Sequence, residues 1–168
     1  MREELPELGL TVSATTRQPR EGDIDGVQYF FKTPEEFDRL IEEGAFLEWA
    51  PYNGERYGTL LSEVERNMAS GHSVVLEIEV QGGFAVRERV PDAFLIFVEP
   101  PSMEELERRL RDRGTEDEAS VERRLARARE EMALAPLYDA RIVNDDLDRA
   151  VHEMIDLIDR CETNGGTD

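Results

Sequence analysis

The sequence predicts an α/β domain built on a mainly parallel sheet with helices on both faces. Short apolar runs alternate with segments of helical periodicity, and two of the expected helices begin with a capping-box pattern. A third observation is the central run, residues 73–80, which begins fully apolar and then alternates with glutamate. A buried strand has this pattern when its carboxyl end reaches a cleft, and ligands of such sheets bind beyond the carboxyl ends of the strands.

The first third of the chain supplies two strands, a helix and a turn. Residues 10–12 form a short apolar run that predicts a strand. Residues 33–36 (TPEE) form a capping box with proline at the first helical position, which predicts a helix to about Gly44. Residues 46–49 predict another strand, and residues 53–54 (NG) are a turn signal.

The middle of the chain continues the alternation around the central strand. Residues 62–65 (SEVE) form a second capping box, whose helix should end at Gly71. After the central strand, residues 81–83 (QGG) turn into a helix that should reach about Val90. Residues 94–98 are apolar throughout and predict a buried strand.

The last third is rich in charge and mostly helical. Residues 102–105 (SMEE) cap a helix, and a further helix is expected within the charged stretch 104–131. Its helical spacing is carried by Val121, Leu125, Ala128 and Met132. Residues 140–143 predict the last strand, residues 144–146 (NDD) open the final helix, and the polar tail 163–168 is expected to be disordered.

The composition limits the partners and the compartment. The chain has 39 acidic and 20 basic residues, a net charge of −19, which repels nucleic acid and anionic membrane, so neither is expected as a partner. Lys32 is the only lysine, and all other basic residues are arginine. This bias has three possible origins, which the sequence does not separate: coding bias, an acidic salt-adapted surface, and a need for bidentate contacts. No apolar run approaches the ~20 residues of a membrane span. With one cysteine, Cys161, and no secretory signal pattern, we expect a cytoplasmic protein without disulfides.

A first candidate site follows the first predicted strand. Residues 13–20 (SATTRQPR) offer hydroxyl groups and two arginines three positions apart, Arg17 and Arg20. Guanidinium groups match the geometry of phosphate oxygens, so this loop is a candidate phosphate site. The alternative is a polar loop whose arginines are solvated or pair with Glu21 and Asp23.

Three glutamates on predicted strands form a second set of candidates. Glu48 lies inside an apolar strand, where a carboxylate needs a partner, and one carboxylate can accept both the N1–H and the N2 amine of guanine. Glu77 and Glu79 alternate at the end of the central strand, about 7 Å apart on one face, and suit magnesium or a ligand amine. The alternatives are a solvated strand face and a hydrated sheet edge.

The arginine-rich stretch near the carboxyl end is a further candidate. Its arginines include Arg109, Arg113, Arg124 and Arg127. A mobile helix pair of this composition could fold over a polyphosphate, and the alternative is an exposed helix pair held by salt bridges.

In order and spacing, these motifs resemble those of the guanylate kinase family, the P-loop kinases that phosphorylate GMP. The matching segments are SATTRQPREGDIDGVQYFF, FLEWAPYNGERYGT, VVLEIEVQG, RLRDRGTEDEASVERRL and IVNDDLDRA, and the resemblance runs from Val12 to about Arg160. The combination of TTRQPR, GxxYGT and IVNDD in this order is specific. The resemblance implies a parallel sheet of the P-loop kinase type flanked by helices, with a GMP-binding subdomain and a helical lid.

The resemblance also implies roles for individual residues on the GMP side. The GMP phosphate would be held by Ser13, Arg17, Arg20, Tyr29 and Tyr57. Glu48 would bind guanine N1 and N2, and Thr59, where the family usually has serine, would contact the base. Where the family often has aspartates, this chain has Glu77 and Glu79. Glu79 would belong to the GMP site, and Glu77 would contact a metal through water.

On the ATP side, the resemblance implies catalysis by arginines and a magnesium ion that accompanies ATP. Arg113 and Arg124 would contact the ATP phosphates and, with Arg17, act in catalysis, while Asn144 would lie near adenine. The family's phosphate loop, G-x-x-x-x-G-K-[ST], has no match here, so the first strand and the P-loop are expected to be absent. The only lysine, Lys32, lies near no glycine-rich loop.

The expected organisation is one guanylate-kinase-like domain over residues 1–162. Its core would comprise 1–14 and 72–162, its GMP-binding subdomain about 15–71, and its lid about 109–127. The expected function is transfer of phosphate from ATP to GMP. The alternatives are an inactive guanylate-kinase-like binding module and, less favoured because of Glu48, a kinase for another monophosphate.

Overall fold

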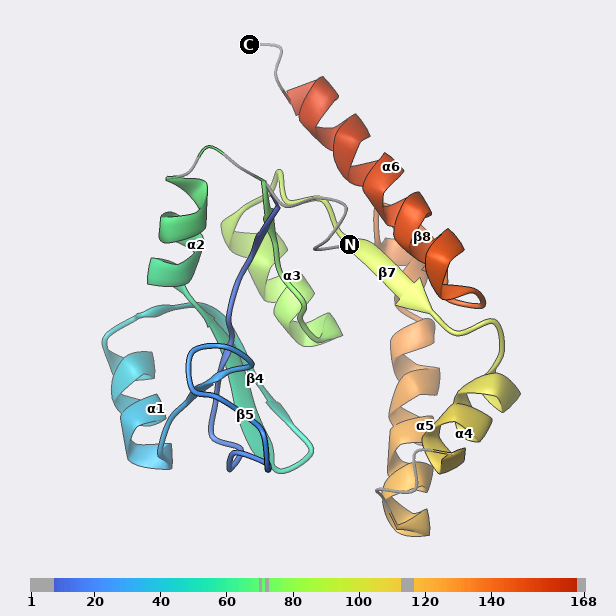
Figure 1. Ribbon diagram of the computed structural model, residues 1–168, viewed down its shortest axis with the longest axis horizontal. Helices are drawn as coiled ribbons and strands as arrows, with labels where there is room; N and C mark the ends of the chain where they lie inside the picture. The colour runs from blue at the N-terminus through green and yellow to red at the C-terminus, as the bar shows by residue number, and fades with distance from the viewer. Residues whose placement is uncertain (1–7, 70, 72, 113–116, 166–168) are drawn as a thin grey trace. The chain divides into compact units, whose positions relative to one another are not determined.

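The computed structural model describes residues 8–69, 71, 73–112 and 117–165, and it confirms the α/β class. The chain forms two compact units that divide between Ala93 and Phe94 (Figure 1). Each unit has its own strands, helices and cluster of buried apolar side chains. None of the helices within the described residues is long and apolar enough to cross a membrane.

The first unit contains a parallel strand pair and a four-stranded sheet. β1 (Gly9–Leu10) pairs in parallel with β6 (Val74–Val75). The other sheet has the strand order β3-β2-β5-β4. Its strands are β2 (Ala14–Thr15), β3 (Phe30–Phe31), β4 (Phe46–Tyr52) and β5 (Glu55–Leu60). β2 and β3 run in parallel, whereas β5 is antiparallel to both β2 and β4.

Two local predictions in this unit are confirmed in detail. Helix α1 (Pro34–Glu42) begins with the predicted capping box: Thr33 Oγ1 accepts from the Glu36 N–H at 3.2 Å, and the Glu36 carboxylate accepts from the Thr33 N–H at 2.8 Å. The turn between β4 and β5 places Asn53 at φ 50° and Gly54 at φ 84°. These positive φ values are those of the tight hairpin turn that an Asn-Gly pair favours.

The core of the first unit fixes α1 against the four-stranded sheet. The rings of Phe37 and Phe46 stack with their centroids 4.6 Å apart, and both side chains are buried together with Ala14. The partly buried residues around them are Phe30, Leu40, Ile41 and Leu60. On the other side of β4, helix α3 (Val80–Arg89) is tied down by Arg89, whose Nη1 donates to the carbonyl oxygens of Phe46 at 2.7 Å and Leu47 at 2.8 Å.

Two predicted elements of the first unit differ from the structure. Helix α2 (Leu61–Met68) starts before the expected capping box, with Leu60 at the N-cap and no side-chain cap. Glu63 is instead buried and accepts from the backbone N–H of Val12 at 3.3 Å and from Arg66 at 2.8 Å. The central strand is shorter than predicted. β6 covers only two residues, and residues 76–79 run without strand pairing because β1, its only partner among the described residues, is itself two residues long.

The second unit contains one parallel strand pair and three helices among its described residues. β7 (Ile96–Glu99) pairs with β8 (Ala140–Val143), the segment predicted as the last strand. The helices are α4 (Met103–Asp112), α5 (Glu118–Met132) and α6 (Leu147–Gly165), with a 3₁₀ turn at Ala135–Leu137. Helix α6 therefore extends into the segment that was expected to be a tail.

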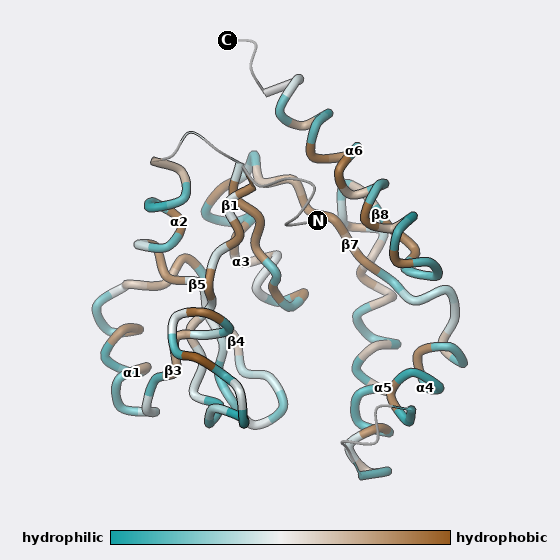
Figure 2. The backbone as a smooth tube through the Cα atoms, in the orientation of Figure 1, coloured by the Kyte–Doolittle hydropathy of each residue, from teal (hydrophilic) through white to brown (hydrophobic). Residues whose placement is uncertain are grey.

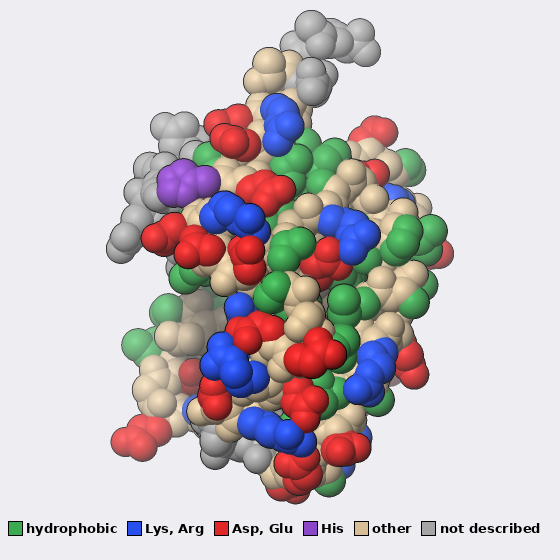
Figure 3. All heavy atoms as spheres, turned by 90° about the vertical axis from the view of Figure 1, so that its right-hand side faces the viewer, with side chains coloured by type: hydrophobic (Ala, Val, Ile, Leu, Met, Phe, Trp, Pro, Cys, Tyr) green, Lys and Arg blue, Asp and Glu red, His purple; other side chains and the backbone are tan. Residues whose placement is uncertain are grey.

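Helices α4 and α5 pack through a narrow apolar stripe. Leu110, Val121 and Leu125 are buried there, two of them at the positions that helical spacing predicted. Most of the other residues of these helices are charged, and Figure 2 shows teal segments along both of them. Figure 3 shows acidic and basic side chains interspersed on the face turned toward the viewer. The predicted cap of α4 is confirmed, because Ser102 Oγ accepts from the Glu105 N–H at 3.1 Å.

Candidate functional site

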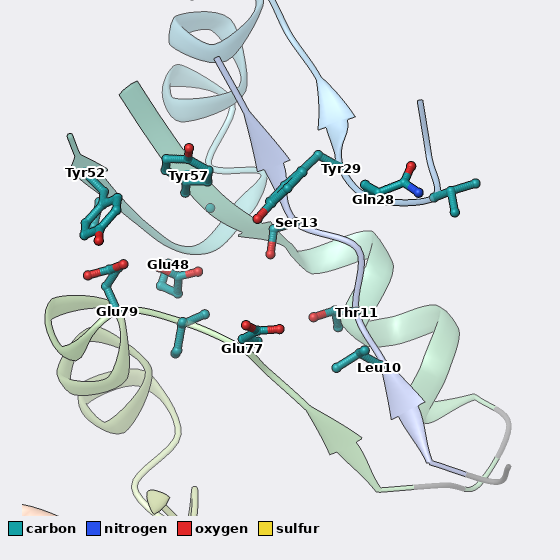
Figure 4. A pocket seen from close by; sticks show the side chains of 14 residues that line it. Leu10, Thr11, Ser13, Gln28, Tyr29, Glu48, Tyr52, Tyr57, Glu77 and Glu79 are labelled. Carbon is teal, nitrogen blue, oxygen red and sulfur yellow. The ribbon is translucent and has the colours of Figure 1, made fainter. Parts of the chain in front are cut away.

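The first unit encloses a cleft of about 560 Å³ between the four-stranded sheet and the segment that leads into α3. Six of the predicted site residues line it: Ser13, Tyr29, Glu48, Tyr57, Glu77 and Glu79. Figure 4 shows their side chains around one common space. Residues separated by up to 66 positions in the sequence therefore meet in one pocket.

Glu48 lies on β4 at the inner wall of this pocket. Its side chain is only 6% exposed, and its Oε1 accepts a hydrogen bond of 2.7 Å from Thr59 Oγ1. Burial raises the pKa of Glu48, and the hydrogen bonds from the side chain and backbone of Thr59 lower it in part. Thr59 is fully buried on β5 and does not line the pocket. Its hydroxyl thus anchors one carboxylate oxygen of Glu48.

Three tyrosines form the wall opposite the carboxylates. The ring centroids of Tyr29 and Tyr57 are 5.8 Å apart, and those of Tyr52 and Tyr57 are 6.2 Å apart, both with edge-to-face geometry. Burial and the neighbouring Tyr57 and Glu77 raise the pKa of Tyr29, so its hydroxyl remains a neutral donor near pH 7. This wall offers hydroxyl groups on a rigid aromatic base.

The two arginines of the first loop do not line the pocket. The guanidinium of Arg17 pairs with Asp23 at 2.9 Å and lies over the rings of Tyr29 at 5.3 Å and Phe31 at 5.4 Å. The side chain of Arg20 is exposed, and its backbone N–H donates to Asp23 at 2.8 Å. These bonds, first that of Arg20 and then that of Arg17, lower the pKa of Asp23. Arg17 is held beside the pocket through its contact with Tyr29.

The segment before α3 brings the other two carboxylates to the pocket. Glu77 is exposed, and Glu79 is the residue before the first turn of α3, with φ −69° and ψ 160°. Both side chains line the cavity. Within the described ranges, no three side chains of His, Cys, Asp or Glu come close enough together to hold a metal ion. A cation beside Glu77 would therefore need oxygen ligands from water or from a bound nucleotide.

Several lining residues were not predicted as part of the site. They are Leu10, Thr11, Val27, Gln28, Ala50, Tyr52, Gly58 and Ile78. Ala50 and Tyr52 follow Glu48 at intervals of two on the same strand, so the alternation along β4 was a signal that could have found them. Thr11 had no such signal. Its Oγ1 is buried and has no hydrogen-bond partner among the residues that the structure describes.

Comparison with known proteins identifies the family of the chain. Residues 2–161 match the family model described as guanylate kinase. The chain belongs to the guanylate kinase family. A guanylate kinase from Rubrobacter xylanophilus is 52% identical over 161 residues, which are 96% of this chain and 84% of that protein. One from Caldanaerobacter subterraneus subsp. tengcongensis is 46% identical over 164 residues, or 96% of this chain and 80% of the other.

A solved structure confirms the guanylate kinase fold. The crystal structure of guanylate kinase from Anaplasma phagocytophilum matches with a TM-score of 0.79 at 33% sequence identity. The match covers 95% of this chain and 78% of that chain. The similarity therefore extends over both units of this guanylate kinase family member.

The remaining candidate residues of the sequence analysis belong to the second unit. Arg113 lies outside the described residues. Arg124 lies on α5 and is half-buried. Asn144 directly follows β8; its N–H donates to the carbonyl oxygen of Glu99 at 2.8 Å, and its own carbonyl accepts from Arg109 at 2.9 Å. Arg127 pairs with Glu131 at 2.7 Å along α5.

Proposed function

We propose that this chain binds GMP in the pocket of the first unit and catalyses transfer of phosphate to it from ATP. The observation that carries the proposal is Glu48, a buried carboxylate on the pocket wall whose geometry Thr59 fixes. Guanine presents two adjacent N–H donors, and a single carboxylate can accept both. Burial removes the water molecules that would stabilise the negative charge of this carboxylate, and the two N–H donors of guanine would replace them.

The phosphate of GMP would lie toward the tyrosine wall. Tyr29 and Tyr57 offer hydroxyl donors, Ser13 lies beside Tyr29 (Figure 4), and Arg17 supplies positive charge behind the Tyr29 ring. Arg20 would complete the set, because its exposed side chain can change rotamer toward a bound anion without disturbing any packing. Guanidinium groups and phenolic hydroxyls bind phosphate through charge-assisted hydrogen bonds.

The transfer step would depend on positioning and electrostatics, without a covalent intermediate. Magnesium accompanying ATP would neutralise phosphate charge, with Glu77 as an outer ligand through water. Arg17, Arg113 and Arg124 would stabilise the charge that develops during transfer, and Asn144 would contribute to the adenine site. Glu79, at the start of α3, would complete the GMP side of the pocket.

A second candidate, an inactive guanylate-kinase-like module that binds a partner, is favoured by one observation. The sequence contains no G-x-x-x-x-G-K-[ST] match, so these residues lack the motif that cradles the ATP phosphates in P-loop kinases. The residues implied for the GMP site are all present in this sequence, and this favours the enzyme over the partner-binding module.

Calorimetry and an activity assay together test the proposal. The chain should bind GMP and discriminate against AMP, because adenine has an acceptor at N1 and only a C–H at C2, where guanine presents two donors. ADP formation from ATP and GMP, measured for this chain preceded by a segment that carries the G-x-x-x-x-G-K-[ST] motif, would then separate the enzyme from the binding module. Equal affinities for GMP and AMP would contradict the role of Glu48 and with it the proposed substrate.

A further inference from the structure

Gly82 lies in the first turn of α3, directly against the carboxylate of Glu48. A Cβ atom added to Gly82 would lie 2.6 Å from Oε2 of Glu48 and 3.2 Å from its Cδ. Carbon and oxygen atoms that are not bonded do not approach this closely, so one of the two groups would have to move. The next neighbour, Cβ of Ile78, is at 3.4 Å and would tolerate the added atom.

The carboxylate is the group that would move. Helix α3 is fixed to β4 because Arg89 donates to the carbonyl oxygens of Phe46 and Leu47. The Glu48 carboxylate is the end of a flexible side chain, held in place on its other side by the 2.7 Å hydrogen bond from Thr59. The Glu48 carboxylate therefore lies between two neighbours, with Oε1 hydrogen-bonded to the Thr59 hydroxyl and Oε2 next to Gly82.

We propose that Gly82 is a positioning residue that sets the base specificity of the pocket through Glu48. Its missing side chain leaves the space in which Oε2 lies, so that both carboxylate oxygens can accept from a base edge with two adjacent N–H donors. The proposal rests on the function proposed above, in that guanine is the base. An added methyl group at position 82 displaces Oε2 and breaks the two-point pairing while one hydrogen bond remains possible.

The test is Gly82→Ala, measured by calorimetry with GMP and with IMP, which keeps the N1–H of guanine but lacks the 2-amino group. The Kd for GMP should rise about tenfold and that for IMP by no more than about threefold, because IMP uses only one of the two hydrogen bonds. The urea midpoint of unfolding should stay constant or rise, since alanine is the better helix former. Gln81→Ala, at an exposed position in the same turn, is the matched control and should change neither Kd.

A double-mutant cycle shows whether the effect passes through Glu48. In a Glu48→Gln background the carboxylate pairing is already lost, so adding Gly82→Ala should weaken GMP binding by less than about twofold. A full tenfold loss there, or equal losses for GMP and IMP in the wild-type background, would overturn the proposal.

Unfolding measurements separate this proposal from the proposed function. Gly82→Ala should raise the urea midpoint more in a Glu48→Ala background, where the added methyl group meets no carboxylate, than in the wild type. If the wild-type chain does not bind GMP, the proposed function fails, and this comparison alone tests whether Gly82 constrains the Glu48 carboxylate. Equal changes in the two backgrounds would show that Gly82 does not constrain Glu48.

Discussion

The two units hold their charged groups in different ways. In the first unit, Glu48 is 6% exposed and Arg17 is 16% exposed, and each is fixed by hydrogen bonds or aromatic rings. In the second unit, Arg108 is 62% exposed and pairs along α4 with Glu105 and Asp112. Exposed pairs of this kind contribute little to stability. The first unit thus holds the Glu48 carboxylate in a fixed geometry, whereas an exposed arginine such as Arg108 of the second can exchange partners at small cost.

The largest expected effect separates binding from transfer. A protein of these 168 residues should bind GMP in its first unit yet form ADP at least about 100-fold more slowly than the ~10 s⁻¹ typical of enzymes. The reason is that the sequence contains no motif whose backbone N–H groups, lysine and hydroxyl would hold the ATP phosphates and magnesium. ADP formation would be followed for this chain and for the same chain preceded by a segment that carries the motif. Fast turnover by the 168 residues alone would show that other groups cradle ATP.

The next effect tests the preformed geometry of the first unit. Glu48→Gln should weaken GMP binding by roughly 1.5–3 kcal/mol, or about 10- to 150-fold in Kd, because an acceptor for the base becomes a donor. Calorimetry on both proteins gives the ratio. Equal affinities would remove Glu48 from the binding site.

Glu63→Gln is the matched control for that measurement. Glu63 is the other buried glutamate among the described residues of the first unit, but it lies on α2 and does not line the pocket. Its substitution should lower stability, because it accepts from both Val12 and Arg66, and should leave the Kd for GMP unchanged. A loss of GMP affinity in this variant would show that any buried carboxylate of the unit affects binding through the fold.

Local signals in the sequence predicted more of the fold than of the site's fine geometry. The capping box at Thr33 and the turn at Asn53 depend on neighbouring residues only, and both are confirmed. The burial of Glu63 was not predictable in this way, because its partner Val12 is 51 residues away. Likewise, the contact between Gly82 and Glu48 arises from the packing of α3 on β4, which no local pattern encodes.

A smaller effect is expected at the phosphate end of the pocket. Arg20→Lys keeps the charge but loses the planar pair of donors, so the Kd for GMP should rise about tenfold while that for guanosine stays constant. The side chain is exposed, so the substitution leaves the packing of the first unit intact. Calorimetry with both ligands separates the phosphate contribution from the base contribution. A parallel loss for guanosine would mean that the variant disturbs the base site.

The smallest expected effect is on the stability of the fold, which should depend on pH through Glu48. For Glu48→Gln, the effect on stability should have the opposite sign to the effect on GMP binding. Burial raises the pKa of Glu48 in the folded protein, so the native state holds this proton more tightly than the unfolded state does. The resulting stabilisation is complete below the unfolded pKa and is lost as pH rises through the folded pKa. At pH 7 the buried charge therefore destabilises the fold, and Glu48→Gln should raise the urea midpoint while it weakens GMP binding.

The raised pKa of Glu48 also predicts how the difference in urea midpoint between Glu48→Gln and the wild type depends on pH. The gain from Glu48→Gln should shrink as pH falls toward the ordinary glutamate range, because the wild-type carboxyl then becomes neutral as well. Glu63→Gln should instead lower the midpoint at pH 7, since it removes a carboxylate that two donors already stabilise. Urea unfolding of the wild type, Glu48→Gln and Glu63→Gln at pH 7 and pH 5 measures the direction in which each substitution shifts the midpoint. A lower midpoint for Glu48→Gln at pH 7 would mean that Thr59 and α3 already compensate the buried charge, and the carboxylate would then stabilise the pocket even without a ligand.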